Sequence, residues 1–331
     1  MNIIPFSTEV TYTAPDYELI KLNIGKMLQQ NAEADFAFNE TKYLPSIHTK
    51  ARGLHTSIVQ AKRNIDESID TLKTVSAKAL SNLNKYRAQA TEELTDEEIE
   101  ANTYAREQTI ITFKKAYAPA VEVIQQRYKA LADVTFDPAL TTTYKDALQA
   151  DLTQLNTALA AIDAEAAALE NSRTIINDAM AVLEKGNFVD IAKDTLITAE
   201  SISALGLVAP QVEIIKFAIE HMKKTLENIG EALNYLTMYE QRELLVSKIK
   251  ALKPKQADYA AQVKTISSKT KLIVSIHGLF ENFFGARAEY SKVEQSISAF
   301  ADLMAVTKQA DYEDRLVAAA PSLVAYLNIA R

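Results

Sequence analysis

The chain of 331 residues contains no cysteine. This excludes disulfides, thiolate catalysis and cysteine-based metal sites, and it makes the chain indifferent to the redox state of its compartment. Glycine and proline are scarce, at seven and eight residues, which is far below ordinary usage. Because these two residues mark turns and breaks, the chain offers few places at which a helix is interrupted.

Histidine is equally rare, with only His48, His55, His221 and His277. None lies in an HExxH motif or beside acidic residues at ligand spacing, so each is expected to be a surface or core side chain. The glycines stand alone and form no phosphate-binding loop, and no GxSxG motif occurs. We therefore predict no catalytic residue, no cofactor and no metal site, and a protein that is not an enzyme.

Long apolar runs are also missing. No stretch of eighteen apolar residues exists, because Gln211, Glu213 and Lys216 interrupt the best window, so no permanent membrane span is expected. The first residues, MNIIPFSTEVTYTAPDYE, have neither the basic region nor the apolar region of a secretory signal peptide. A net charge of −7 disfavours nucleic acid as a partner. We expect a protein that is first soluble and that is secreted, if at all, without a classical signal peptide.

The residues that are abundant are those of long helices. Apolar residues make up 48% of the chain, which is enough for a core, and Ala, Leu, Glu, Lys and Gln are common. Apolar positions recur in steps of three and four through several long stretches, and this heptad spacing predicts antiparallel coiled-coil packing. The clearest stretch contains Leu148, Leu152, Leu155, Leu159, Ile162, Ala166, Leu169, Ile176, Met180 and Leu183. The fold class is predicted as all-α, an elongated bundle of long antiparallel helices.

Caps and breaks predict where these helices begin and end. Thr95 with Glu98 forms a capping-box pattern; a calcium site in the same acidic run is disfavoured, because the ligand spacing and turn glycine are absent. Helix rise makes the helix 138–185 roughly 70 Å long and a return helix from Gln211 roughly 60 Å long. The predicted helices are 16–44, a helix from Leu54, 96–135, 138–185, 211–253 closed by Pro254, 259–285 closed by Gly285, 290–304 and 311–329.

One stretch interrupts the pattern. Residues 186–220, which we call the head, contain two of the seven glycines and turn apolar around Ile202 to Pro210, between the two longest predicted helices. We predict that the head is a tip inserted in the longest hairpin, that residues 1–185 and 221–331 form the tail and neck, and that Gly186, Gly206 and Pro210 are hinges.

An acidic, cysteine-free chain with one apolar head in its longest hairpin resembles the α-helical pore-forming toxins, the group of cytolysin A and of enterotoxin and haemolysin components. It looks most like the B component of the binary xenorhabdolysin-type cytotoxins, whose A partner has the more apolar membrane foot. The resemblance implies a virulence factor that is soluble as a monomer and assembles into an oligomer with a second helical component on a target host-cell membrane.

The resemblance also implies which residues contact membrane or partner: Ile202, Leu205, Leu207, Val208, Val212, Ile214, Ile215 and Phe217. Charged residues remain among them, including Glu213, Lys216 and Glu220. Each charge costs a few kcal/mol at the centre of a bilayer, so unaided insertion of one monomer is not expected. The segment suits an amphipathic pore lining, with charges toward water and apolar side chains toward lipid or a partner.

Two other interpretations stay open. The head residues could form a cap that folds back on its own hairpin, which would make the chain a non-enzymatic coiled-coil scaffold or interaction protein. A membrane-bending coiled coil is the other, but a curvature sensor should present a basic face and this chain is acidic.

Overall fold

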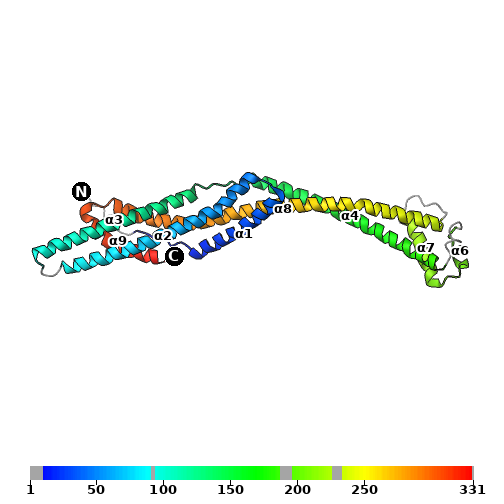
Figure 1. The fold of residues 1–331 in the computed structure, drawn as a ribbon, viewed down its shortest axis with the longest axis horizontal. Helices are drawn as coiled ribbons and strands as arrows, with labels where there is room; N and C mark the ends of the chain where they lie inside the picture. Colours follow the sequence, from blue (N-terminus) through cyan, green and yellow to red (C-terminus); the bar gives the residue numbers. More distant parts are fainter. Residues whose placement is uncertain (1–9, 91–93, 187–195, 226–232, 330–331) are drawn as a thin grey trace. The chain divides into compact units, whose positions relative to one another are not determined.

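The structure is a computed structural model that describes residues 10–90, 94–186, 196–225 and 233–329 (Figure 1). Within these ranges the elements are helices and no strand occurs, which confirms the predicted all-α class. The helices are α1 (Tyr17–Thr41), α2 (Pro45–Gln89), α3 (Asp96–Ala132), α4 (Ala139–Lys185), α6 (Ala199–Ala204), α7 (Ala209–Thr225), α8 (Tyr235–Ala305) and α9 (Tyr312–Ile329), with a short 3-10 helix, η1 (Gln309–Asp311).

The chain divides into two compact units. The first unit comprises residues 1–145 and 268–331, and the second unit comprises residues 146–267. The division cuts α4 and α8, each of which contributes to both units. The predicted head, residues 186–220, therefore lies inside the second unit, together with most of α4 and the first part of α8.

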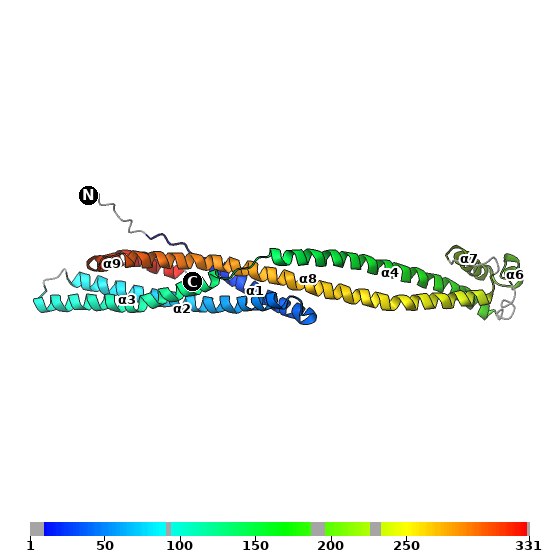
Figure 2. The same cartoon turned by 90° about the horizontal axis from the view of Figure 1, so that it is seen from above.

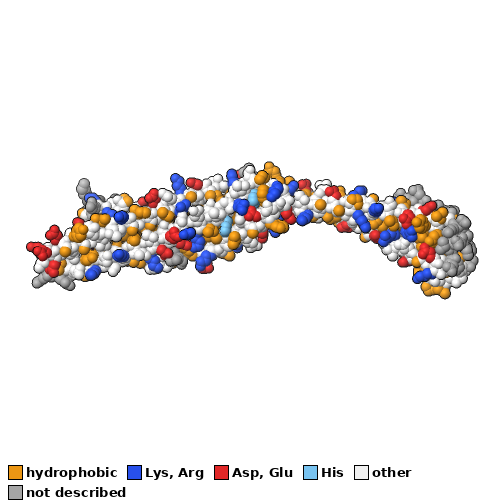
Figure 3. Space-filling model, in the orientation of Figure 1, with side chains coloured by type: hydrophobic (Ala, Val, Ile, Leu, Met, Phe, Trp, Pro, Cys, Tyr) orange, Lys and Arg blue, Asp and Glu red, His pale blue; other side chains and the backbone are white. Residues whose placement is uncertain are grey.

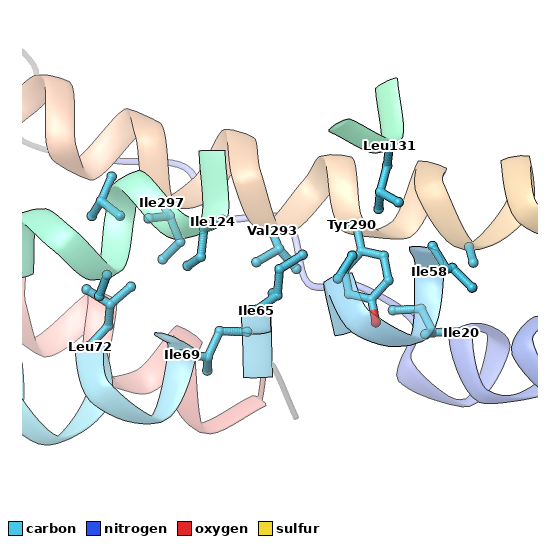
Figure 4. Packing of buried hydrophobic residues seen from close by; sticks show 14 of the residues in the cluster. Ile20, Ile58, Ile65, Ile69, Leu72, Ile124, Leu131, Tyr290, Val293 and Ile297 are labelled. Atoms are coloured by element: carbon cyan, nitrogen blue, oxygen red, sulfur yellow. The ribbon is translucent and has the colours of Figure 1, made fainter. Parts of the chain in front are cut away.

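The core of the first unit is a continuous apolar cluster. Figures 1 and 2 show α2 and α3 running side by side as a hairpin, with α8 and α9 along them. Buried side chains from α1, α2, α3 and α8 point toward one another in Figure 4, including Ile65, Ile124 and Val293. The heptad spacing places one such side chain on the inner face at every turn or two. The predicted capping box is confirmed, because Thr95 and Glu98 satisfy each other's backbone N–H groups at the start of α3.

Polar residues fix how α1 lies on α8. Glycines and serines on α8 face longer polar side chains on α1, and the pairs are Gly285 with Asn23, Gly278 with Gln30, Ser275 with Glu33 and Ser268 with Glu40. The residue numbers of every pair have the same sum, so all four belong to one antiparallel register. A Cβ atom at Gly285 would lie 2.7 Å from the Asn23 amide nitrogen, so glycine is what permits this close approach.

An ion cluster joins α9 to the α2–α3 hairpin. The Glu313 carboxylate accepts hydrogen bonds from Arg87 Nε at 3.0 Å and from Arg106 Nη2 at 2.7 Å. Only 15% of the Glu313 side chain is exposed, and Arg87 also contacts Asp314. A carboxylate that is this buried and shared by two guanidinium groups holds three helices at one point.

In the second unit, α4 and the first part of α8 form an antiparallel pair (Figures 1 and 2). Tyr235 donates a hydrogen bond to Glu184 at 2.6 Å, and Gln256 donates one to Asp163 at 2.8 Å. These contacts are 21 residues apart along both helices, which is three heptads, so one register runs through the pair. The predicted helix 138–185 and its end before Gly186 are confirmed.

The predicted breaks in the last third of the chain are wrong. Neither Pro254 nor Gly285 ends a helix, and α8 runs through both for 71 residues, including the predicted separate helix 290–304. Pro254 lies on an exposed face, where water can solvate the carbonyl group that loses its backbone donor. Gly285 serves packing against Asn23 rather than termination.

The predicted return helix 211–253 is also wrong as a single element. It is divided into α7, which ends at Thr225, and α8, which begins at Tyr235. Asn234 explains the new start, because its side chain accepts a hydrogen bond from the Thr237 backbone N–H at 2.8 Å, as a helix N-cap does. Part of the predicted helix, residues 226–232, lies outside the described residues.

Three other boundaries shift by a few residues. The first helix ends at Thr41 rather than at Leu44, because Lys42 and Leu44 both adopt left-handed backbone conformations. The second begins at Pro45 rather than at Leu54, with the proline in its first turn, where a missing N–H costs nothing. The third ends at Ala132 instead of Thr135.

Candidate functional site

The described part of the head consists of α6, α7 and the turn between them. Thr198 caps α6 by accepting a hydrogen bond from the Ser201 N–H. Gly206 follows in a left-handed conformation with φ of +65°, and Pro210 lies exposed in the first turn of α7. A positive φ favours glycine, so the chain reverses here at a residue suited to it. Gly186 directly follows α4, and residues 187–195 lie outside the described residues. The hinge roles of Gly186, Gly206 and Pro210 stay predictions.

Five of the eight predicted contact residues pack inward. Ile202 and Ile215 are buried in a second apolar cluster with Ile176 and Met180 of α4, and with Met238 and Leu245 of α8. Leu205, Leu207 and Val212 are partly buried against the same cluster. This side of the head is therefore folded against its own helical pair, as the folded-back interpretation expects.

The other three predicted residues point outward. Val208 is 60% exposed and Phe217 is 58% exposed, and Ile214 is exposed to a lesser degree. Ile214 and Phe217 are three residues apart and share one side of α7, and exposed apolar side chains that form one patch are typical of binding sites. The structure thus divides the predicted set into a buried group and an exposed group.

The positions around α7 show how the two groups are arranged. Each residue of an α-helix is rotated by about 100° from the residue before it. On this basis Ile215, Ala218 and Met222 lie on the buried side of α7, and its five charged residues span an arc of about 100° around the helix axis. Pro210, Ile214 and Phe217 fall between these two arcs. The apolar surface of α7 is therefore wider than the part that is buried, and it reaches solvent beside the charges.

One side-chain hydrogen bond joins α7 to α4. His221 Nε2 lies 3.0 Å from Ser172 Oγ, and the Ser172 hydroxyl donates to the Ala168 carbonyl oxygen at 3.0 Å. Because the hydroxyl has a single proton, the imidazole must be the donor at Nε2.

Sequence reasoning missed further exposed side chains near the head. In the described part of the second unit, the large exposed apolar residues all fall between residues 196 and 244, and they are Leu196, Val208, Ile214, Phe217, Leu236, Tyr239 and Leu244. None lies on α4 after residue 145 or on α8 between residues 245 and 267. Figure 3 shows hydrophobic side chains reaching the surface around α7. The signal that could have found Leu236 and Tyr239 is Asn234, whose side chain caps a new helix directly before them.

Among the described residues, no helix is long and apolar enough to cross a bilayer, and no three histidine, aspartate or glutamate side chains gather as metal ligands. Two of the histidines, His48 and His277, have partners within the first unit. His48 is buried, stacks on Phe38 and lies 2.7 Å from Asp35, and His277 contacts Thr141. Burial, with a smaller effect of Lys145, lowers the pKa of His277.

No protein-family model and no curated protein sequence matches the chain. Solved structures do. PaxB from Photorhabdus luminescens is 18% identical, with 96% of each chain covered and a TM-score of 0.71. XaxB from Xenorhabdus nematophila is 16% identical, with 96% of this chain and 97% of that chain covered and a TM-score of 0.67. The YaxAB pore complex matches at 15% identity over 90% of this chain and 92% of that chain, with a TM-score of 0.58. The chain therefore has the fold of these proteins, as its resemblance to the B components predicted.

Proposed function

We propose that this chain is a non-enzymatic subunit of an α-helical pore-forming cytotoxin. In this proposal it is soluble as a monomer, leaves the producing cell without a classical signal peptide, and assembles with a second helical component on a target host-cell membrane. The fold similarity to PaxB and XaxB and to a chain of the YaxAB pore complex supports the proposal.

The observation that carries it is the distribution of exposed apolar side chains in the second unit. They gather between residues 196 and 244 and are absent from the described α4–α8 pair beyond them. A coiled coil that served only as a spacer would have no reason to expose Val208 and Phe217 at one end. We propose that these side chains, with Ile214, make the first contact with lipid or with the second component.

The five inward-facing residues would act in a second step. Ile202, Leu205, Leu207, Val212 and Ile215 would leave the cluster on α4 and α8 for lipid or partner, while Glu213 and Lys216 face a water-filled lumen. The charged arc of α7 supports the need for a partner, because several charges at a few kcal/mol each outweigh the apolar gain of crossing alone. Gly186, Gly206 and Pro210 are the positions at which the backbone would turn.

The second candidate is a coiled-coil scaffold with a folded-back apolar cap. The burial of Ile202 and Ile215 favours it, since those side chains already have a partner within the chain. The exposure of Val208 and Phe217 does not follow from it.

Dye release from phosphatidylcholine vesicles separates the two candidates. The pore-forming proposal expects little release by this chain alone and strong release when a second long-helix chain with a more apolar hairpin is added, for which an adjacent reading frame is the first place to look. Intact vesicles in the presence of both chains, with the two shown to bind each other, would support the scaffold.

A further inference from the structure

The first turns of α8 lie outside the predicted head, yet they carry exposed apolar surface. Leu236 is 53% exposed and Tyr239 is 43% exposed, directly after the cap at Asn234. Tyr235 lies one turn before Tyr239 and is half-buried. Residues four apart share one side of a helix, so the two tyrosines lie next to each other on α8.

Both tyrosines are engaged by charged groups of this chain. The Tyr235 hydroxyl donates to Glu184 in the last turn of α4 at 2.6 Å. The Arg242 guanidinium carbon lies 4.5 Å from the centre of the Tyr239 ring, and Arg242 Nη2 donates to Glu243 at 2.6 Å. Burial and the hydrogen bond to Glu184 raise the pKa of Tyr235 to about 12, so its hydroxyl remains a neutral donor at neutral pH.

The first charged residues of α8 come directly after the two tyrosines. At the start of α8 the apolar Leu236 is exposed, and Leu196 is exposed next to Ile197, whose N–H donates to the Leu233 carbonyl oxygen at 2.7 Å. After the two tyrosines, α8 continues with Glu240, Arg242 and Glu243, and then with the exposed Leu244. A tyrosine has an apolar ring and a polar tip, and such side chains concentrate where hydrocarbon gives way to the headgroups of a bilayer.

We propose that Tyr235, Leu236 and Tyr239 occupy the headgroup region of the target bilayer and set the depth to which the second unit enters it. This inference rests on the proposed pore-forming function and adds α8 to its membrane surface. Lipid fits this surface better than a protein groove does, because Arg242 is already paired with Glu243 rather than held out for a partner's carboxylate. The Arg242–Glu243 ion pair carries no net charge, and beside the two tyrosines it suits zwitterionic headgroups.

The chain contains no tryptophan, so a single introduced tryptophan reports one position. The test uses Tyr239→Trp, with Tyr104→Trp as a matched control, because Tyr104 is an exposed tyrosine on α3 of the first unit. Each variant is mixed with the second component and with phosphatidylcholine vesicles brominated either near the glycerol or near the chain end, and dye release is recorded in parallel. We expect the emission of Tyr239→Trp to shift to the blue and to be quenched more by the shallow bromines, while Tyr104→Trp changes in neither respect.

Several results would overturn the inference. Stronger quenching by the deep bromines would place residue 239 in the hydrocarbon core, and a blue shift without quenching would show that protein covers it. Release of dye with unchanged emission would leave the pore-forming function standing and remove α8 from the membrane surface. If even the wild-type chain with its partner releases no dye, the proposed function fails and this inference fails with it.

Discussion

Ile215 and Phe217 are two residues apart on α7 and lie on different sides of it, so their replacement by alanine should have different consequences. Ile215 is fully buried, and deleting such a side chain costs about 2 to 5 kcal/mol in lost transfer energy and residual cavity. Phe217 is 58% exposed, and complete burial of such a side chain contributes about 1.5 to 3 kcal/mol. The buried part of Phe217 therefore accounts for about 1 kcal/mol.

Amide hydrogen exchange followed by mass spectrometry measures the effect locally, in peptides that cover α7. A loss of about 2 to 5 kcal/mol speeds exchange by about 30-fold to more than 1,000-fold, up to the rate of an unprotected chain. We expect this for Ile215→Ala, and an increase of about fivefold for Phe217→Ala. Peptides from α2, in the first unit, should exchange at wild-type rates in both variants and serve as the internal control.

Equal acceleration in the two variants would refute the reasoning. It would mean that Phe217 is held as firmly as Ile215 in the free chain, and the division of the head into a buried and an exposed group would be lost. Acceleration in neither variant would mean that the cluster on α4 and α8 does not hold α7.

Three further predictions concern the first unit. Because the pKa of His277 is lowered in the folded state, the unfolded chain binds the proton more readily, so the free energy of unfolding should fall as pH drops below about 6.5. In urea denaturation at a series of pH values, His277→Gln should reduce this fall. Glu313→Ala removes the carboxylate shared by Arg87 and Arg106, but these arginines are 32% and 29% exposed and Arg87 keeps Asp314, so the loss should be about 1 to 3 kcal/mol in the same assay; no loss would show that the cluster is solvated. Thr95→Ala removes the α3 capping box and should cost about 1 kcal/mol, seen first as faster exchange in the first turn of α3.

The long helices could be predicted because their signals are local and repeated. Heptad spacing defined α2 and α4 without knowledge of their neighbours, and the capping box at Thr95 and the end of α4 before Gly186 were correct to within a residue or so. Agreement among many weak local preferences over forty or more residues makes such assignments dependable.

The two wrongly predicted helix ends, at Gly285 and Pro254, occurred where the effect of a residue depends on its surroundings in the fold. Gly285 was interpreted as a helix end, but its meaning depends on Asn23, which is more than 250 residues away in the chain. A proline ends a helix only where neither water nor a relaxed turn can replace the missing hydrogen bond. The sequence did not show that Pro254 would lie on the solvent-exposed side of α8.

The candidate site was predictable as a region but not as a surface. Apolar composition located the head, yet Ile214 and Ile215 are adjacent, identical residue types with opposite exposure. Only the position of α7 against α4 and α8 distinguishes them. Leu236 and Tyr239 were missed because the sequence suggested one continuous helix through them, whereas the cap at Asn234 starts a new helix directly before them.

The most direct test of the central claim compares dye release by Val208→Asp and Val306→Asp, each with the second component present and at helicity equal to wild type. Val208 is exposed in the head, and Val306 is exposed just after α8 in the first unit, so both changes add one charge to exposed apolar surface. If the head acts at the membrane, Val208→Asp should release dye far more slowly than wild type, because a charge there costs a few kcal/mol on entering a bilayer, while Val306→Asp should behave as wild type. Equal release by all three proteins would contradict the claim and leave the scaffold as the better account.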